Sequence, residues 1–410
     1  MRRFGKAGFT AAAGLMACLY LALPVSAAES PLISGTETEA DADPAYGPAV
    51  DTGTEESSDT EENQSSYTEE QLNDNVVEYG ELEELVRRGN VTALNSENSY
   101  QTSLAVYEEA YNTMVSGIGD MNYKADELED EGGDEALIAV YEQNADILSS
   151  SAKQYRRSLE SLNSVSNQAS RDRIVWEQVK MAQSLLGTCV QMEAQTASVE
   201  KTAEASQAAC DRKVAERAAG LCTEEELLEA EETLLAAQTA ALQTKSQADS
   251  SKRQLGILIG KNGSSLELGE IPAVTEDELE ALDLDSDRAM AVIADSTVKS
   301  LRSSSATGDA ERRSRENRLE DAKGTASITI DEQYQEIASL SLARDAAQAA
   351  YEAAEKDYHA LQIKYQSGAI NKGDYLTGEA EYYQKKADME SAEASLRAAY
   401  DSYQWMLKGV

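Results

Sequence analysis

Several residue types are scarce in this chain, and each shortage excludes some classes of protein. Five of its 410 residues are proline, and none lies between Pro48 and Pro272. Because proline interrupts helices, this gap permits long continuous ones. With one histidine and no Cys-x-x-Cys pair, zinc chemistry lacks its usual ligands. Strand patterns are scarce too, since residues 327–330 are the one short β-like run.

Positive charge is also scarce. The chain has 36 Lys and Arg against 75 Asp and Glu, a formal net charge of -39. Binding to phosphates needs the opposite sign, so we expect no nucleic acid partner. We interpret the charge as the solvated surface of an exported protein. The alternative is a Ca²⁺ or basic-partner role, but the acidic cluster at residues 126–135 lacks the ordered ligand spacing of a calcium loop.

Cysteine is too sparse for a disulfide framework. Cys18 lies in the N-terminal apolar segment, which leaves Cys189, Cys210 and Cys222, an odd number. Cys189 and Cys210 fall on one predicted helix, roughly 30 Å apart at about 1.5 Å per residue, and cannot bridge within it. We expect free thiols that pack as small apolar side chains.

No catalytic arrangement is present, so we expect a protein that is not an enzyme and has no cofactor or metal. The single histidine, His359, is expected at a solvated helix position, and no evident base stands ready to activate a serine. A tyrosine-rich set is expected to pack in a helix seam rather than to form a ligand platform. Its members are Tyr351, Tyr358, Tyr365, Tyr375, Tyr382 and Tyr383.

The N-terminal segment has the pattern of an export signal. Residues 1–27 combine a basic start, an apolar stretch at residues 7–23 and the small-x-small pattern Val25-Ser26-Ala27, so we expect cleavage after Ala27. Lipidation at Cys18 is the alternative. Residues 28–78 follow as an acidic disordered tether, because residues 29–75 are rich in Asp, Glu, Ser and Thr and contain no Lys or Arg. The tether would hold the folded part away from a membrane or cell wall that lies nearby through the N-terminal segment.

A helical hairpin is predicted at the C-terminal end. Apolar and small residues repeat there at alternating steps of four and three, the spacing of a coiled-coil seam. Gly368 stops the first helix, and Asn371 with Asp374 supplies N-cap chemistry for the second. The ascending seam contains Ala347, Tyr351, Ala354, Tyr358, Leu361 and Tyr365. The descending seam contains Leu376, Ala380, Tyr383 and Ala387 and, after a short slip, resumes with Ala392, Leu396, Ala399, Tyr403 and Met406.

The same element occurs earlier, which indicates a duplication. Residues 217–228 align without a gap with residues 365–376, and residues 81–85 resemble residues 278–282. Internal repeats of this kind determine the fold. We therefore predict a first helical-hairpin repeat at residues 79–265 and a second at residues 266–410.

The remaining segments are predicted as follows. Residues 81–109 form one or two helices with a break near Gly89, and residues 134–162 form another. Residues 117–120 and 132–134 are expected to interrupt the chain between them, because both are rich in glycine. A long helix covers residues 171–219, and its return helix begins at Thr223, which forms a capping box with Glu226. Residues 303–324 are expected to be a loop or frayed helix.

These hairpins resemble the TolC family of outer membrane efflux proteins. The resemblance is carried by two glycine-containing tips, each followed by a polar cap, an acidic residue, a leucine and an alanine-rich helix. In the first tip these are Gly220, Leu221, Thr223, Glu226, Leu228 and Ala230. In the second they are Gly368, Ala369, Asn371, Asp374, Leu376 and Ala380. The expected fold class is all-α, with duplicated long antiparallel coiled-coil helical hairpins and no membrane β-barrel, as in a barrel-less relative.

The resemblance implies an export-associated, non-enzymatic function in the cell envelope. It implies a conduit or adaptor-binding component, a membrane-fusion adaptor or transporter as partner, and a homo-oligomer such as a trimer. The resemblance implies that the partner-binding residues are those of the hairpin tips: Gly220, Leu221, Gly368 and Ala369. The alternative is a cell-surface coiled-coil scaffold or regulator of cell-wall remodelling. A tube predicts a defined oligomer and a seam on two faces of each hairpin, whereas a scaffold that uses the hairpin as a lever predicts a monomer or dimer.

Overall fold

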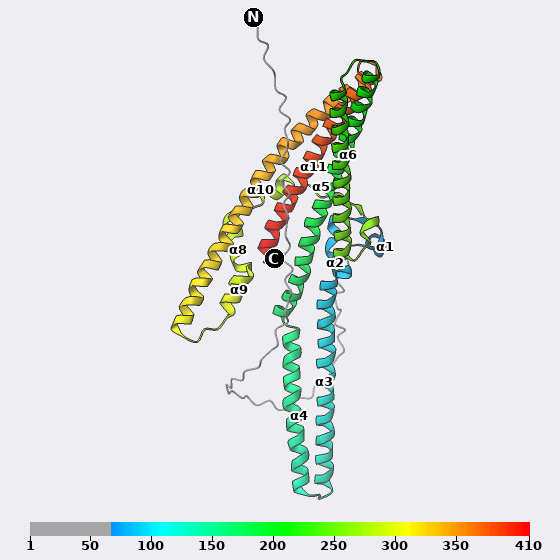
Figure 1. Cartoon of the computed structure of the whole chain (residues 1–410). Helices are drawn as coiled ribbons and strands as arrows, with labels where there is room; N and C mark the ends of the chain where they lie inside the picture. Colours follow the sequence, from blue (N-terminus) through cyan, green and yellow to red (C-terminus); the bar gives the residue numbers. More distant parts are fainter. Residues whose placement is uncertain (1–66) are drawn as a thin grey trace. The chain divides into compact units, whose positions relative to one another are not determined.

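The computed structural model describes residues 67–410. The expected signal peptide and residues 28–66 of the expected tether lie outside the described residues. Figure 1 shows the described part as long helices that run side by side in hairpins.

The end of the expected tether is folded, which moves the start of the ordered chain. Residues 67–78 contain α1 (Glu69–Asn73) and β1 (Val76–Val77). Strand β1 pairs in parallel with β2 (Glu267–Leu268), and Val76 is opposite Glu267. Leu72 and Val77 are buried because they pack into the core at the base of the first hairpin. The expectation of disorder to residue 78 is therefore wrong for these last residues.

The first repeat is helical throughout, and polar side chains cap its helices. Its break near Gly89 is confirmed, because the side chain of Asn90 accepts hydrogen bonds from the first backbone N–H groups of the next helix. The capping box of Thr223 and Glu226 is also confirmed. The elements are η1 (Tyr79–Glu81), α2 (Leu82–Gly89), α3 (Val91–Asp130), α4 (Glu135–Leu162), α5 (Val165–Ala218) and α6 (Glu224–Ile259).

A linker and the shorter second repeat follow. The linker contains η2 (Gly263–Ser265) and β2, so the strand that opens the second repeat pairs with the segment that precedes the first. The second repeat contains α7 (Glu276–Glu280), α8 (Leu284–Ala294), α9 (Ser296–Ser303), α10 (Asp309–Gln366) and α11 (Lys372–Lys408).

The expected interruption at residues 117–120 is absent, because α3 continues through it. Glycine in a helix costs about 1 kcal/mol relative to alanine, which packing can offset. Gly117 faces α4, where an added Cβ atom would lie 3.1 Å from Cδ1 of Leu148. The small residue thus lets two helices approach closely. The second expected break, at residues 132–134, is confirmed, since Gly132 has φ of +69° and turns the chain into α4.

The expected loop at residues 303–324 is also shorter than the sequence indicated. Helix α10 begins at Asp309, so only residues 304–308 are non-helical. Local ion pairs support the first turns, with Arg312 at 2.7 Å from Asp309 and Lys323 at 3.1 Å from Glu320. The β-like run at residues 327–330 lies inside the same helix, and its Ile330 is buried against the second core.

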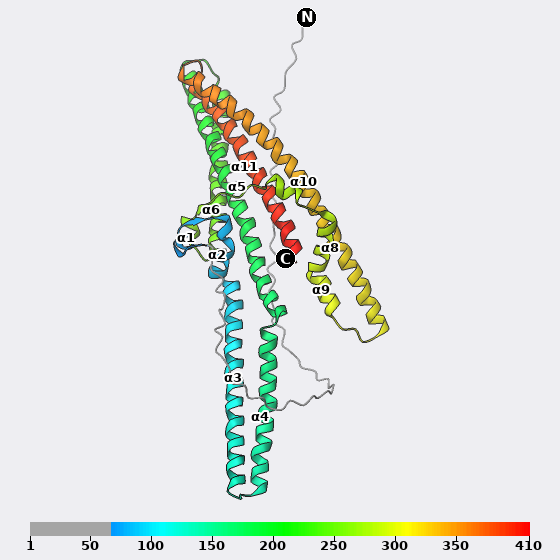
Figure 2. The same ribbon diagram turned by 180° about the vertical axis from the view of Figure 1, so that it is seen from behind.

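Four long helices pack in the order α6, α5, α11, α10. Each of the outer two packs mainly on its own hairpin partner, and α5 contacts α11 at the centre (Figures 1 and 2). Below this row, α3 and α4 form a further hairpin. One core joins the base of the first hairpin to Trp405, and a second surrounds Tyr403, so opposite faces of one turn of α11 serve the two repeats.

The expected fold class of all-α duplicated hairpins is confirmed, since 86% of residues 67–410 are helical. Among residues 67–410, no helix combines the length and apolar character required to cross a membrane.

Candidate functional site

The two hairpin tips have the same backbone geometry. Gly220 has φ of +73° and Gly368 has φ of +74°, the left-handed conformation that favours glycine. At the first tip, the N–H of Leu221 donates to the carbonyl of Glu216 at 2.8 Å. The N–H of Ala369 donates to the carbonyl of Lys364 at 2.8 Å in the second. This helix-ending pattern satisfies carbonyl groups that would otherwise lack partners. The matching geometry supports the gap-free alignment of the tips.

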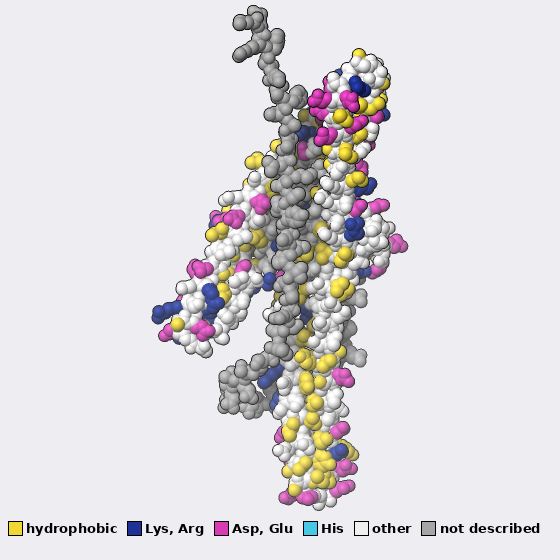
Figure 3. Space-filling model, viewed as in Figure 1, with side chains coloured by type: hydrophobic (Ala, Val, Ile, Leu, Met, Phe, Trp, Pro, Cys, Tyr) yellow, Lys and Arg dark blue, Asp and Glu magenta, His cyan; other side chains and the backbone are white. Residues whose placement is uncertain are grey.

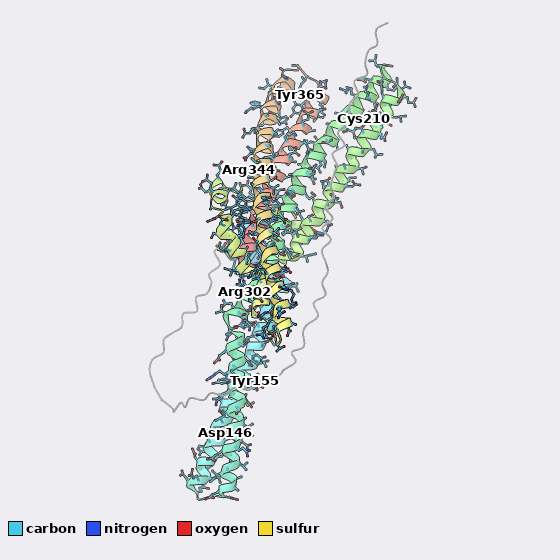
Figure 4. All side chains as sticks on the ribbon, turned by 90° about the vertical axis from the view of Figure 1, so that its left-hand side faces the viewer. Asp146, Tyr155, Cys210, Arg302, Arg344 and Tyr365 are labelled. Carbon is cyan, nitrogen blue, oxygen red and sulfur yellow. The ribbon has the colours of Figure 1, made fainter. Side chains whose placement is uncertain are left out.

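The residues predicted for partner contact are all exposed. Leu221 is 78% exposed, a large fraction for a leucine, and Gly220, Gly368 and Ala369 are exposed as well. Both tips lie at the same end of the helix row, and Figure 4 labels Tyr365 and Cys210 close to them. Cys222 is buried beneath the first tip, where its Sγ atom lies 3.4 Å from the carbonyl oxygen of Lys213. The tips therefore form one end surface with a single large apolar side chain from the first repeat.

The predicted tyrosine seam is confirmed between α10 and α11. Rings from the two helices alternate along the hairpin. Tyr358 stacks on Tyr382 with centroids 4.6 Å apart, and Tyr365 stacks on Tyr375 at the same distance. Stacked and tilted aromatic pairs stabilise a seam beyond their buried area. His359 is exposed beside this seam, as expected.

One hydrogen-bonded group ties this seam to α5. The hydroxyl of Tyr358 donates to Oε1 of Glu379 at 2.6 Å, and Tyr375 donates to the same atom at 3.2 Å. The other carboxylate oxygen of Glu379 lies 3.5 Å from Nζ of Lys201 on α5. Burial and the bond to Glu379 raise the pKa of Tyr358 well above its usual value. The two hairpins are therefore joined near their tips by polar contacts.

Polar contacts continue down the interface between α5 and α11, which the sequence did not predict. Ser198 donates to Gln384 at 2.9 Å, and Gln191 donates to Ser395 at 3.1 Å. At the base, the indole N–H of Trp405 donates to Gln183 at 2.6 Å. These residues share no local motif, because each contact joins positions more than 180 residues apart.

A buried charged group fixes the start of the first repeat on α11. Tyr79 donates its hydroxyl hydrogen to Asp401, and Arg397 lies 2.9 Å from the same carboxylate. Burial raises the pKa of Asp401 despite these two partners, and it also raises the pKa of Tyr79. Arg397 further pairs with Glu278 at 3.5 Å, so this group anchors three segments of the fold. Its role is structural.

The two outer helices carry exposed apolar stripes on the faces turned away from their hairpin partners. On α6, three leucines recur at steps of seven and are 57%, 66% and 70% exposed: Leu228, Leu235 and Leu242. On α10, a second seam runs at alternating steps of four and three; all of its members are exposed, and all but Lys356 are apolar. They are Leu342, Ala346, Ala349, Ala353, Lys356, Ala360 and Ile363. A helix with seams on two faces can contact two neighbours at once.

These features define an open row of long helical hairpins with two apolar edges and an exposed tip surface. Across residues 67–410, no group of His, Cys, Asp or Glu is arranged to hold a metal. Cys189, Cys210 and Cys222 are free and buried, as the sequence predicted.

The chain was compared with known proteins. No model of a protein family matches the sequence, and no curated protein matches it. Its structure is similar to the outer membrane protein VceC from Vibrio cholerae, with 14% identity, a TM-score of 0.39 and coverage of 64% of this chain and 76% of that one.

Two other solved structures are similar to a comparable degree. CusC aligns with 15% identity and a TM-score of 0.41 over 81% of this chain and 95% of its own. The CmeC outer membrane channel of Campylobacter jejuni aligns with 12% identity and a TM-score of 0.38 over 81% of this chain and 85% of its own. CusC is described as forming a transmembrane channel and CmeC as an outer membrane channel. At such identities and TM-scores they carry no conclusion about what this chain does.

Proposed function

We propose that this chain is the subunit of an export conduit in the cell envelope. Copies of the chain associate side by side, and their long hairpins become the wall of a tube. The two exposed apolar edges carry this proposal, because a protein that acts alone has no need of a second seam on each outer helix. The proposed activity is passage through the tube, without catalysis by the chain.

The two edges differ, which determines how copies would meet. Helix α6 presents large leucines, whereas the seam of α10 is mostly alanine between Leu342 and Ile363. Leucine knobs from α6 of one copy fit between the alanines of α10 of the next, because small residues allow helices to approach closely. Such a contact joins unlike surfaces and closes into a ring when the rotation between copies divides a full turn. The expected ring is a trimer.

The oligomer is tested by measuring the molar mass of the chain from residue 28 onward by light scattering at several concentrations. We expect a discrete oligomer for the natural chain and a monomer for the variant Leu235→Glu with Leu342→Glu, because charges would replace an apolar contact on both edges. The control is Ile147→Glu, which changes a side chain of similar exposure, 57%, on α4. A monomeric natural chain would refute the tube and leave the scaffold as the better account.

The tips are proposed to contact a membrane-fusion adaptor or transporter. Leu221 supports this, because its side chain is 78% exposed at the first tip and is available for an apolar contact with a partner. A photo-crosslinking residue at position 221, introduced in the cells that make the protein, should yield a covalent adduct with such a partner. The same residue at Val165, which is 82% exposed at the opposite end of α5, should not. Equal adducts from both positions would contradict the assignment.

A further inference from the structure

The free end of α10 carries two arginines that form no ion pair or hydrogen bond within the described chain, although Arg318 is near enough to Glu311 to add to the hydrogen bonds that lower the pKa of that carboxyl group. Arg313 and Arg318 are exposed, and no ion pair is formed by either one among residues 67–410. Figure 3 shows Lys and Arg side chains gathered at this end of the helix, and Figure 4 labels Arg302 on the adjoining α9. This concentration is unusual in a chain with a net charge of -39.

The position of these arginines on the helix is specific. The line of the outer seam of α10, extended toward the N-terminus at the same steps of four and three, reaches Arg318 and Ser314. Arg318 therefore lies on this extended line, and Arg313 flanks it beside Ser314. In a coiled coil, the residues that flank the seam form the ion pairs that select the partner helix and its alignment.

Unpaired acidic side chains lie on the opposite edge of the fold. Helix α3 continues the edge formed by α6, and α4 covers its inner side (Figures 1 and 2). On the face of α3 away from α4, Glu108, Glu109 and Asp120 border a shallow surface hollow. Glu108 and Glu109 are exposed, and neither forms an ion pair within the described residues.

The lengths of the helices bring these two groups to the same level. Helix α10 has 58 residues and α6 has 36, and both begin or end at the tips. Measured along each helix from its tip at about 1.5 Å per residue, Arg313 is therefore about 25 Å farther from the tips than the level at which α6 ends. Helix α3 starts at that level, since Asn90 donates to the carbonyl of Leu258 at 2.9 Å. It reaches Glu108 after the same distance of about 25 Å.

We propose that Arg313 and Arg318 of one copy pair with Glu108 and Glu109 of a second copy of this chain. This pairing extends the apolar contact between α10 and α6 and sets the alignment of the two copies along their length. It rests on the proposed association of copies. In this alignment the arginines of one copy lie opposite the glutamates of the other. A copy shifted along the helix axis by several turns would lose these ion pairs.

Charge reversal and charge exchange test the pairing. Arg313→Glu with Arg318→Glu should weaken self-association at low salt by about tenfold, and Glu108→Arg with Glu109→Arg should do the same. The four changes together should restore affinity to within about threefold of the natural chain, because the charges are again opposite. The effect of each reversal should shrink at 1 M salt, where the screening length is about 3 Å. Sedimentation velocity over a range of concentrations measures all of these.

The matched control is Lys153→Glu with Arg157→Glu, which reverses two exposed, unpaired charges on α4. This variant should associate within about threefold of the natural chain. Circular dichroism should show the same helix content in every variant, since all these positions are exposed. If the natural chain assembles and neither reversal weakens it, or the exchange fails to restore it, the pairing is wrong although the conduit stands. A natural chain that never assembles refutes both.

Discussion

The hydroxyl of Tyr403 on α11 donates to Oδ2 of Asp287 on α8 at 2.7 Å, and both side chains are buried. This contact attaches the last helix to the opening of its own repeat. Replacing Tyr403 with phenylalanine would leave the Asp287 carboxylate buried without this donor. We expect a loss of about 1–3 kcal/mol in the free energy of unfolding, measured by urea denaturation.

The control for that variant is Tyr123→Phe. Tyr123 is 68% exposed and forms no hydrogen bond within the described residues, so its change should stay within about 0.5 kcal/mol. If the two variants were equally stable, the contact between Tyr403 and Asp287 would contribute nothing measurable.

Alanine at the tip glycines should destabilise the chain. No atom lies within 4 Å of a Cβ added at Gly220 or Gly368, so only the left-handed backbone opposes the change. We expect a loss of about 1 kcal/mol for each. Gly324→Ala is the matched control inside α10, where space is equally free and φ is helical, and it should stabilise by about 0.5–1 kcal/mol. Thermal or urea unfolding measures the change in stability of each variant. A change of the same sign in all three variants would contradict this explanation.

Cys189 should resist alkylation in the folded protein. Burial raises the pKa of its thiol to about 12, so at pH 8 the reactive thiolate is almost absent. Treatment with iodoacetamide, followed by mass spectrometry of peptides, should show Cys189 unmodified in the native chain and fully modified in urea. Rapid modification of the native chain at pH 8 would show that α5 opens at this position.

Asp401 should give the folded chain a definite pH dependence. Because its pKa is raised on folding, the folded state binds more protons than the unfolded state above pH about 3.9. The contribution of this carboxyl group to stability is therefore lost as pH rises through that window. The stability of the natural chain relative to Asp401→Asn should fall from pH 4 upward, as measured by urea unfolding at each pH. A relative stability that rises with pH would show that Arg397 and Tyr79 outweigh burial.

Local patterns predicted the hairpins well. The tips depend on glycine conformation and side-chain capping within a few residues, and Gly220, Thr223, Gly368 and Asn371 carry that information themselves. The seam between α10 and α11 was predictable for the same reason, because it depends on the spacing of residues that are close together in the sequence.

The missed features depend on contacts between distant segments. Gly117 reads as a helix breaker unless Leu148 is known to pack against it. The interface between α5 and α11 is held by pairs such as Gln191 with Ser395, which have no shared motif. The outer seam of α10 was hidden because it has the same periodicity as the inner one, and only the packing shows which face is free.

The central claim is that copies of this chain close into a tube, and electron microscopy of negatively stained particles tests it most directly. End-on averages of the chain from residue 28 onward should show a closed ring around a stain-filled centre. That ring should be lost in the variant Leu235→Glu with Leu342→Glu and kept in Ile147→Glu. Single rods, or pairs with no enclosed centre, would contradict the conduit.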